Sequence, residues 1–140
     1  MTENVLITIK GLQFDSVEEN VIEGIHIGRF SEINNKIYVK YDEMLDGERD
    51  PTSNLIKISE GRVEIIKRGQ ISSHMQFFAN EKMISLYNTP FGSLHLGILT
   101  TNIDIDKNED VIHILLEYSL EVNEEQISDY KVEICIKQQD

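Results

Sequence analysis

Arg68 is the residue of this 140-residue chain whose position most suggests a binding role. It ends an expected strand just before a glycine, where a side chain can point into the mouth of a closed sheet. A guanidinium among apolar walls binds a carboxylate or phosphate through two parallel hydrogen bonds. The competing interpretation is structural, with Arg68 paired to an internal carboxylate such as Glu43, because buried charges are normally paired. Polar groups in an otherwise apolar cavity are typical of small-molecule sites. The candidate ligand-binding residues are Arg68, Tyr41, Glu43, Tyr87 and Tyr118.

A metal site is the second chemistry to consider. Oxygen-bearing side chains alternate along residues 104–110 as they do in a calcium loop. However, Glu109 stands where the sharp turn needs glycine, and Leu115 stands where a bidentate glutamate belongs. The segment is therefore interpreted as an acidic hairpin tip. The four histidines lie on different expected strands without the close spacing of paired ligands, so no metal site is predicted.

Catalytic motifs are missing from the sequence. We find no nucleophile elbow, no outstanding carboxylate pair, no glycine-rich phosphate loop and no dinucleotide fingerprint. Cys135 is the only cysteine and lies in an expected strand, where a thiol usually acts as a small hydrophobe. We therefore predict no catalytic residue and no cofactor, and an enzyme is the least favoured class. Such an enzyme would need Glu43, Arg68, His74 and Tyr87 to meet in space.

The net charge of the chain limits the kinds of molecule that it can bind. The chain carries 13 basic and 25 acidic residues, for a net charge of −12, which repels nucleic-acid phosphates and anionic lipid headgroups. The first four residues lack the basic start of a secretory signal, and the apolar runs are too short for a membrane span. We expect a cytoplasmic protein that contacts neither nucleic acid nor membrane, with residues 1–140 forming one domain.

The composition predicts strands. There are 21 Ile and 8 Val residues against a single Ala, and β-branched side chains fit a pleated sheet better than a helix. The clearest hairpin runs over residues 82–100, with Pro90 and Gly92 in its turn. Gly24 and Gly28 interrupt an apolar run and indicate a bend or a close backbone approach. The ten expected strands cover residues 5–10, 21–30, 36–44, 54–59, 62–68, 71–78, 82–87, 93–100, 111–122 and 126–137.

Short connections between consecutive strands predict an antiparallel meander. A twisted sheet of about ten strands rarely stays open, and closure removes its edges. The sequence therefore predicts an all-β barrel of about 8–10 strands. A two-sheet β-sandwich is the alternative, because several strands carry apolar residues on both faces.

A series of motifs points to a family. Its members are Arg68-Gly69, Met75, Phe77, Tyr87-Asn88-Thr89-Pro90-Phe91-Gly92, Thr100 and Tyr118. In this order and spacing they resemble the YwiB-like family of small bacterial proteins, a domain of unknown function, over nearly the whole chain. The resemblance implies a calycin-type, lipocalin-like barrel and a bacterial cytosolic origin, and it implies no established activity.

Two functional hypotheses remain. In the first, a non-enzymatic barrel binds a small, partly apolar or anionic ligand, anchored by Arg68. In the second, the barrel is solid and serves as a structural or protein-interaction module through its acidic face and the polar loop at residues 46–51. The oligomeric state is left open, a homodimer included.

Overall fold

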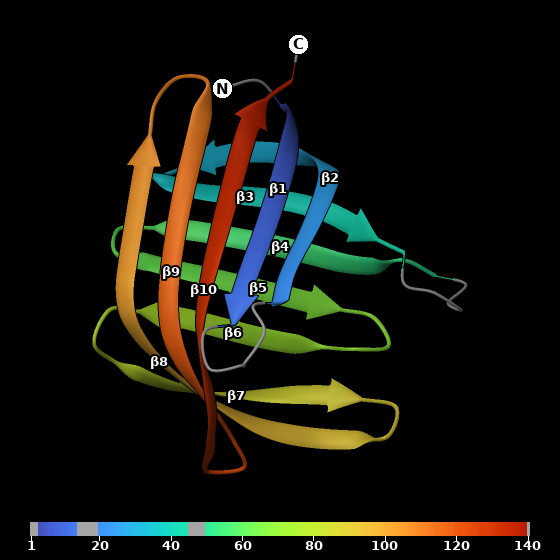
Figure 1. Cartoon of the computed structure of the whole chain (residues 1–140). Coiled ribbons are helices and arrows are strands. Elements are labelled where there is room, and N and C mark those ends of the chain that lie inside the picture. The colour runs from blue at the N-terminus through green and yellow to red at the C-terminus, as the bar shows by residue number, and fades with distance from the viewer. Residues whose placement is uncertain (1–2, 14–19, 45–49, 140) are drawn as a thin grey trace.

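Ten antiparallel strands make up the protein, as the excess of β-branched residues predicts (Figure 1). The computed structural model describes residues 3–13, 20–44 and 50–139. The predicted polar loop at residues 46–51 lies mostly outside this part of the chain. The strands are β1 (Asn4–Gln13), β2 (Asn20–Ile33), β3 (Lys36–Glu43), β4 (Thr52–Ser59), β5 (Arg62–Arg68), β6 (Ser73–Phe78), β7 (Lys82–Thr89), β8 (Gly92–Lys107), β9 (Val111–Val122) and β10 (Glu125–Gln138).

The sheet wraps round until its first and last strands meet. Strands β1 and β10 pair along their length, from Val5 opposite Gln138 to Gln13 opposite Tyr130. All ten strands belong to one sheet in the order β6-β5-β4-β3-β2-β1-β10-β9-β8-β7. Its two edges, β6 and β7, are joined by a single bridge between Ser72 and Asn88. The predicted barrel is therefore confirmed as nearly closed, and the two-sheet alternative is wrong.

Figure 1 shows how the barrel is flattened into two layers. Strands β8, β9, β10 and β1 run across β3, β4, β5 and β6, and β2 bends from one layer into the other. Gly28 lies in this bent strand and is buried. A Cβ atom there would be 2.6 Å from both Ile7 Cδ1 and the Lys40 carbonyl oxygen, so the predicted close approach is confirmed.

The hairpin turns fall between the predicted strands. Asn34 and Asn35 adopt positive φ values of 53° and 64°, a conformation that asparagine tolerates. In the β7–β8 turn, the Thr89 hydroxyl donates to the Gly92 carbonyl and accepts from the Phe91 amide. The β9–β10 turn is tight, and both of its residues, Asn123 and Glu124, adopt positive φ values.

Alternate side chains of both layers point into the interior, where the apolar ones pack together. Ile7, Ile56, Ile98, Ile114 and Leu116 are at most 2% exposed and belong to one core cluster. Burial of this aliphatic surface is the main stabilising contribution to the barrel. In the described part of the chain, no helix is long and apolar enough to cross a bilayer.

Candidate functional site

The inner face of β3, β4, β5 and β6 changes from apolar to polar along the strands. One inward row across these strands consists of Val39, Ile56, Ile65 and Met75. The two rows of interest follow this one toward the side at which β3 and β5 end (Figure 1). Residues directly opposite each other in a sheet share a face, so these rows face the interior as well. We call their members the polar cluster: Tyr41, Asn54, Lys67 and Ser73 in one row, and Glu43 and Thr52 in the next.

The deepest members of the polar cluster have polar atoms without partners. Asn54 is 0% exposed and Thr52 is 1% exposed. The Asn54 amide nitrogen Nδ2 donates to the Thr52 carbonyl at 3.2 Å, which fixes the orientation of the carboxamide. Asn54 Oδ1, Thr52 Oγ1 and Ser73 Oγ are buried without a hydrogen-bond partner among the described residues. Each such group costs on the order of 1–3 kcal/mol, so this arrangement is unfavourable unless another molecule supplies the partners.

An ion pair lies beside these buried groups and is closer to solvent. Lys67 Nζ lies 3.3 Å from Glu43 Oε1, and the two side chains are 31% and 26% exposed. The pair spans β4, whose Thr52 is opposite Glu43 and whose Asn54 is opposite Lys67. The polar cluster therefore combines an ion pair with neutral polar groups that lack hydrogen-bond partners.

Arg68 does not belong to this cluster, which corrects the sequence-based expectation. Its side chain is exposed and lies opposite Ser53 on the outer face. Successive side chains of a strand point to opposite faces, so Lys67 faces inward and Arg68 faces outward. The expected internal partner of Glu43 exists, but it is Lys67 rather than Arg68.

Tyr41, a candidate residue from the sequence, belongs to the polar cluster, and its ring contacts His26. The two rings stack with their centroids 4.5 Å apart. Burial, and secondly the nearby Glu43 carboxylate, raise the pKa of Tyr41 to about 12. The phenol therefore stays protonated at neutral pH and can donate a hydrogen bond.

Tyr118 and Tyr87 lie on other walls of the barrel. The Tyr118 ring stacks on Tyr130 at 5.6 Å and meets the edge of Phe77 at 5.1 Å. Burial, and secondly Tyr130, raise its pKa to about 12. Tyr87 is half-buried on β7. Among the hydrogen bonds of the described residues, none links Tyr118 or Tyr87 to the polar cluster.

The constellation on which an enzyme would depend is not assembled. His74 Nε2 lies 2.8 Å from Glu64 Oε1. His74 is opposite Ile66 and Glu64 is opposite Gln76, which places both on the outer face, away from Glu43. Arg68 is also on the outer face, so Glu43, Arg68, His74 and Tyr87 do not meet as such an enzyme would need.

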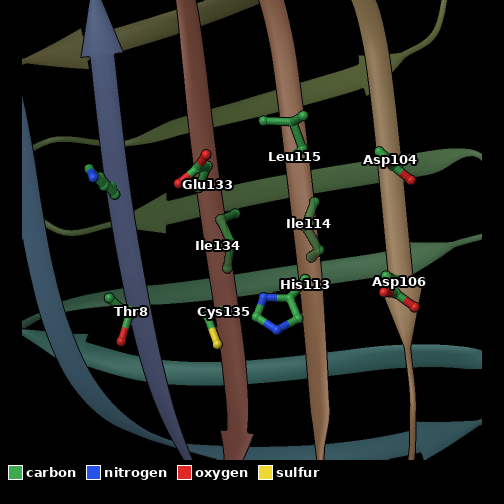
Figure 2. A pocket seen from close by; sticks show the side chains of 10 residues that line it. Thr8, Asp104, Asp106, His113, Ile114, Leu115, Glu133, Ile134 and Cys135 are labelled. Atoms are coloured by element: carbon green, nitrogen blue, oxygen red, sulfur yellow. The ribbon is translucent and has the colours of Figure 1, made fainter.

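A hollow of about 490 Å³ lies on the outer face of β1, β10, β9 and β8 (Figure 2). One cross-strand row in it consists of Thr8, Cys135, His113 and Asp106. The next row consists of Lys10, Glu133, Leu115 and Asp104, each opposite the one before it. No three metal-binding side chains of the described residues are close enough to share an ion. The hollow therefore gathers a thiol, an imidazole and carboxylates on a sheet surface.

The acidic segment that resembles a calcium loop is part of this surface and of the turn beside it. Asp104 and Asp106 alternate with Ile105 near the end of β8. Asn108 Oδ1 accepts hydrogen bonds from the amides of Asp110 and Val111, which closes the β8–β9 turn. The interpretation as an acidic hairpin tip is consistent with this geometry.

The geometry defines a class: an antiparallel, ten-stranded, nearly closed β-barrel with polar groups at one side of its interior. Residues 7–134 match the family model described as "Domain of unknown function (DUF1934)". The chain belongs to this family, as the resemblance predicts.

Two comparisons with individual proteins agree with this assignment. The chain is 29% identical over 122 residues to the "Uncharacterized beta-barrel protein YwiB" of Bacillus subtilis (strain 168), which covers 87% of this chain and 84% of that protein. It is also similar to the crystal structure of the ywiB protein from Bacillus subtilis, with a TM-score of 0.85 and 23% identity, over 99% of this chain and 93% of that one. The structural similarity shows a shared fold, and fold alone does not give a function.

Proposed function

We propose that the protein binds a small molecule in the barrel interior, at the polar cluster. The observation that carries the proposal is the set of three buried atoms without partners, Asn54 Oδ1, Thr52 Oγ1 and Ser73 Oγ. Buried polar groups are almost always paired in folded proteins, and functional sites are the usual exception. A ligand bound here would replace the missing hydrogen-bond partners.

The polar cluster has further properties of a small-molecule site. It offers a few polar groups beside apolar side chains that include Ile56 and Ile65, which lie opposite each other in the adjacent row of the sheet. Most of its side chains project from strands, which hold binding groups more rigidly than loops do. Lys67 replaces Arg68 as the cationic group of the site in this proposal.

The experiment is a screen of a fragment library of mixed charge, read by two-dimensional amide NMR of the whole protein. We expect saturable shifts to concentrate at His26, Tyr41, Asn54, Lys67 and Ser73. Replacing Asn54 with Leu should remove them, whereas Ser53→Ala on the opposite face should not. If no fragment shifts these residues, or if every hit lies elsewhere, the proposal is wrong.

A protein-interaction module remains the second candidate, and one observation favours it. Ile25 and Ile27 on β2 are 65% and 68% exposed. They lie opposite Thr8 and Leu6, so they extend the outer face of β1. Exposed apolar patches often mark protein contacts. The test is sedimentation of the wild type beside an Ile25→Lys, Ile27→Lys variant; a wild-type assembly that the variant loses would favour this candidate.

The proposal includes the cytoplasmic location expected from the sequence. It also includes the calycin-type relationship that the family resemblance implies. Both fit a barrel that binds a small molecule in its interior, and neither depends on the identity of the ligand.

A further inference from the structure

We infer that the ligand is uncharged and rich in hydroxyl groups, as a polyol or a sugar is. This inference depends on the proposed function, because it assigns a ligand class to the same polar cluster. It replaces the anionic or largely apolar ligand that the sequence suggested. Its two independent supports are the types of polar atom left without partners and the charge balance around them.

The unpartnered atoms determine which ligand groups fit. Asn54 Oδ1 is a carbonyl oxygen and can only accept, and the bond from the carboxamide nitrogen to the Thr52 carbonyl fixes which way the carboxamide is turned. The hydroxyls of Thr52 and Ser73 can each donate and accept. A ligand must therefore offer at least one donor for Asn54 Oδ1, and a donor or an acceptor for each of the two hydroxyls. Hydroxyl groups of a ligand meet both requirements, whereas a carboxylate offers no donor.

The charges oppose an ionic ligand. Lys67 is paired with Glu43 at 3.3 Å, so the cluster has no uncompensated charge to offer. An anion would lie beside the Glu43 carboxylate in a protein of net charge −12, and a cation would lie beside the Lys67 ammonium. Arg68, the cation expected to anchor an anion, is on the other face of β5. A neutral ligand is the one that requires no rearrangement of the pair.

Tyr41 completes the set of groups around the ligand. It lies directly opposite Asn54 on the inner face, and its ring is stacked on His26. The C–H faces of a sugar or polyol can pack against such a ring, while the hydroxyl edges meet the polar atoms of β4 and β6.

The test is a titration of the whole protein with six probes, followed by amide NMR that includes the Asn54 side chain. Ribitol, myo-inositol and D-ribose are the neutral probes, octanoate and inorganic phosphate the anionic ones, and choline the cationic one. We expect a neutral probe to cause saturable shifts at Asn54 and Ser73, and the charged probes to cause none there. Loss of one hydrogen bond should weaken this binding about tenfold in Asn54→Leu and about threefold in Ser73→Ala. Ser53→Ala, on the outer face, serves as the matched control.

The outcomes separate this inference from the proposed function. If octanoate, phosphate or choline saturates these residues and the neutral probes do not, the ligand class is wrong and the binding site stands. Library fragments that bind at the cluster without any polyol binding have the same meaning. If neither the six probes nor the library shift these residues, both proposals are wrong. Should Asn54→Leu fail to fold, the conservative Ser73→Ala variant still decides between these outcomes.

Discussion

The hydroxyl group of Thr52 is buried and, among the described residues, has no hydrogen-bond partner. A Cβ atom at Gly69 would lie 2.5 Å from this oxygen, so the side chain is enclosed on that side. Valine has nearly the same shape and lacks the polar atom. We therefore expect Thr52→Val to raise the free energy of unfolding by about 1 kcal/mol, because it removes an unsatisfied buried group.

Urea denaturation of the ligand-free protein measures this effect. The exposed neighbour Ser53→Ala should change stability by less than about 0.5 kcal/mol. A fall in stability for Thr52→Val would mean that the hydroxyl is satisfied by ordered water, and that the polar cluster serves the fold rather than a ligand.

The two buried tyrosines make a prediction about alkaline pH. The pKa values of Tyr41 and Tyr118 are raised from 10.0 to about 12 in the folded protein. A folded-state pKa above the unfolded value contributes stability that is complete below pH 10 and is lost as pH rises toward 12. Each difference corresponds to on the order of 2 kcal/mol.

Phenolate absorbance checks this directly. We expect a late step near pH 12 that shrinks in both Tyr41→Phe and Tyr118→Phe. Complete titration near pH 10, while the protein is still folded by circular dichroism, would contradict the burial of these phenols.

The candidate site shows which parts of residue-level prediction succeed. Glu43 and Tyr41, two of the candidate residues, lie on the inner face, where they alternate with outward residues of β3. The cationic group was expected at Arg68, whereas it is Lys67. Two adjacent basic residues end β5, and which of them points inward depends on strand pairing that the sequence does not show. Thr52 and Asn54 lie on the same face of β4 as the buried Ile56, because side chains of a strand alternate between faces. This alternation could have identified both as inward-facing residues.

At the scale of elements, Gly28 allows β2 to pass between the two layers. A methyl group there would meet Ile7 Cδ1 and the Lys40 carbonyl at 2.6 Å, and the carbonyl belongs to the backbone of β3. We expect Gly28→Ala to lower the free energy of unfolding by about 2 kcal/mol through overpacking. Gly11→Ala in β1 is the matched control, since no atom lies within 4 Å of its Cβ position.

Thermal and urea unfolding of the two alanine variants test this prediction. The control should be neutral or slightly stabilising, because alanine restricts the unfolded chain. Equal stability of Gly28→Ala and Gly11→Ala would show that β2 is not constrained at this point.

Strands were predicted well wherever turn residues separate two runs of alternating apolar and polar residues. Asn34-Asn35, Glu60-Gly61 and the β7–β8 turn all lie between strands as expected. The end of β8 was missed, because Asp104 and Asp106 look like loop residues while their carboxylates simply point outward from a strand. Local composition does not reveal how far a strand continues into a charged run.

At the scale of the whole molecule, closure was predictable but its weak point was not. The number of strands and the cost of free edges predict that the ends of the meander meet. The two ends do meet, through a full ladder between β1 and β10, but an interruption falls between the consecutive strands β6 and β7. Their sequence resembles any other hairpin, so the sequence does not show this interruption (Figure 1).

The seam between β6 and β7 leads to the last prediction. Backbone bonds in both directions join Ser72 and Asn88, and the Ser85 hydroxyl donates to the His74 carbonyl at 2.6 Å. No further ladder between these strands is present in the described chain, so the seam depends on few hydrogen bonds.

We expect amide hydrogen exchange at Ser72 and Asn88 to be much faster than in the β1–β10 ladder, because local opening costs less where fewer contacts must break. Ser85→Ala should accelerate exchange at these two amides about fivefold by removing one hydrogen bond. Ser119→Ala is the control, since its hydroxyl donates to Asp129 on the outer face. Equal protection of the seam and of the β1–β10 ladder would show instead that the barrel opens only as a whole.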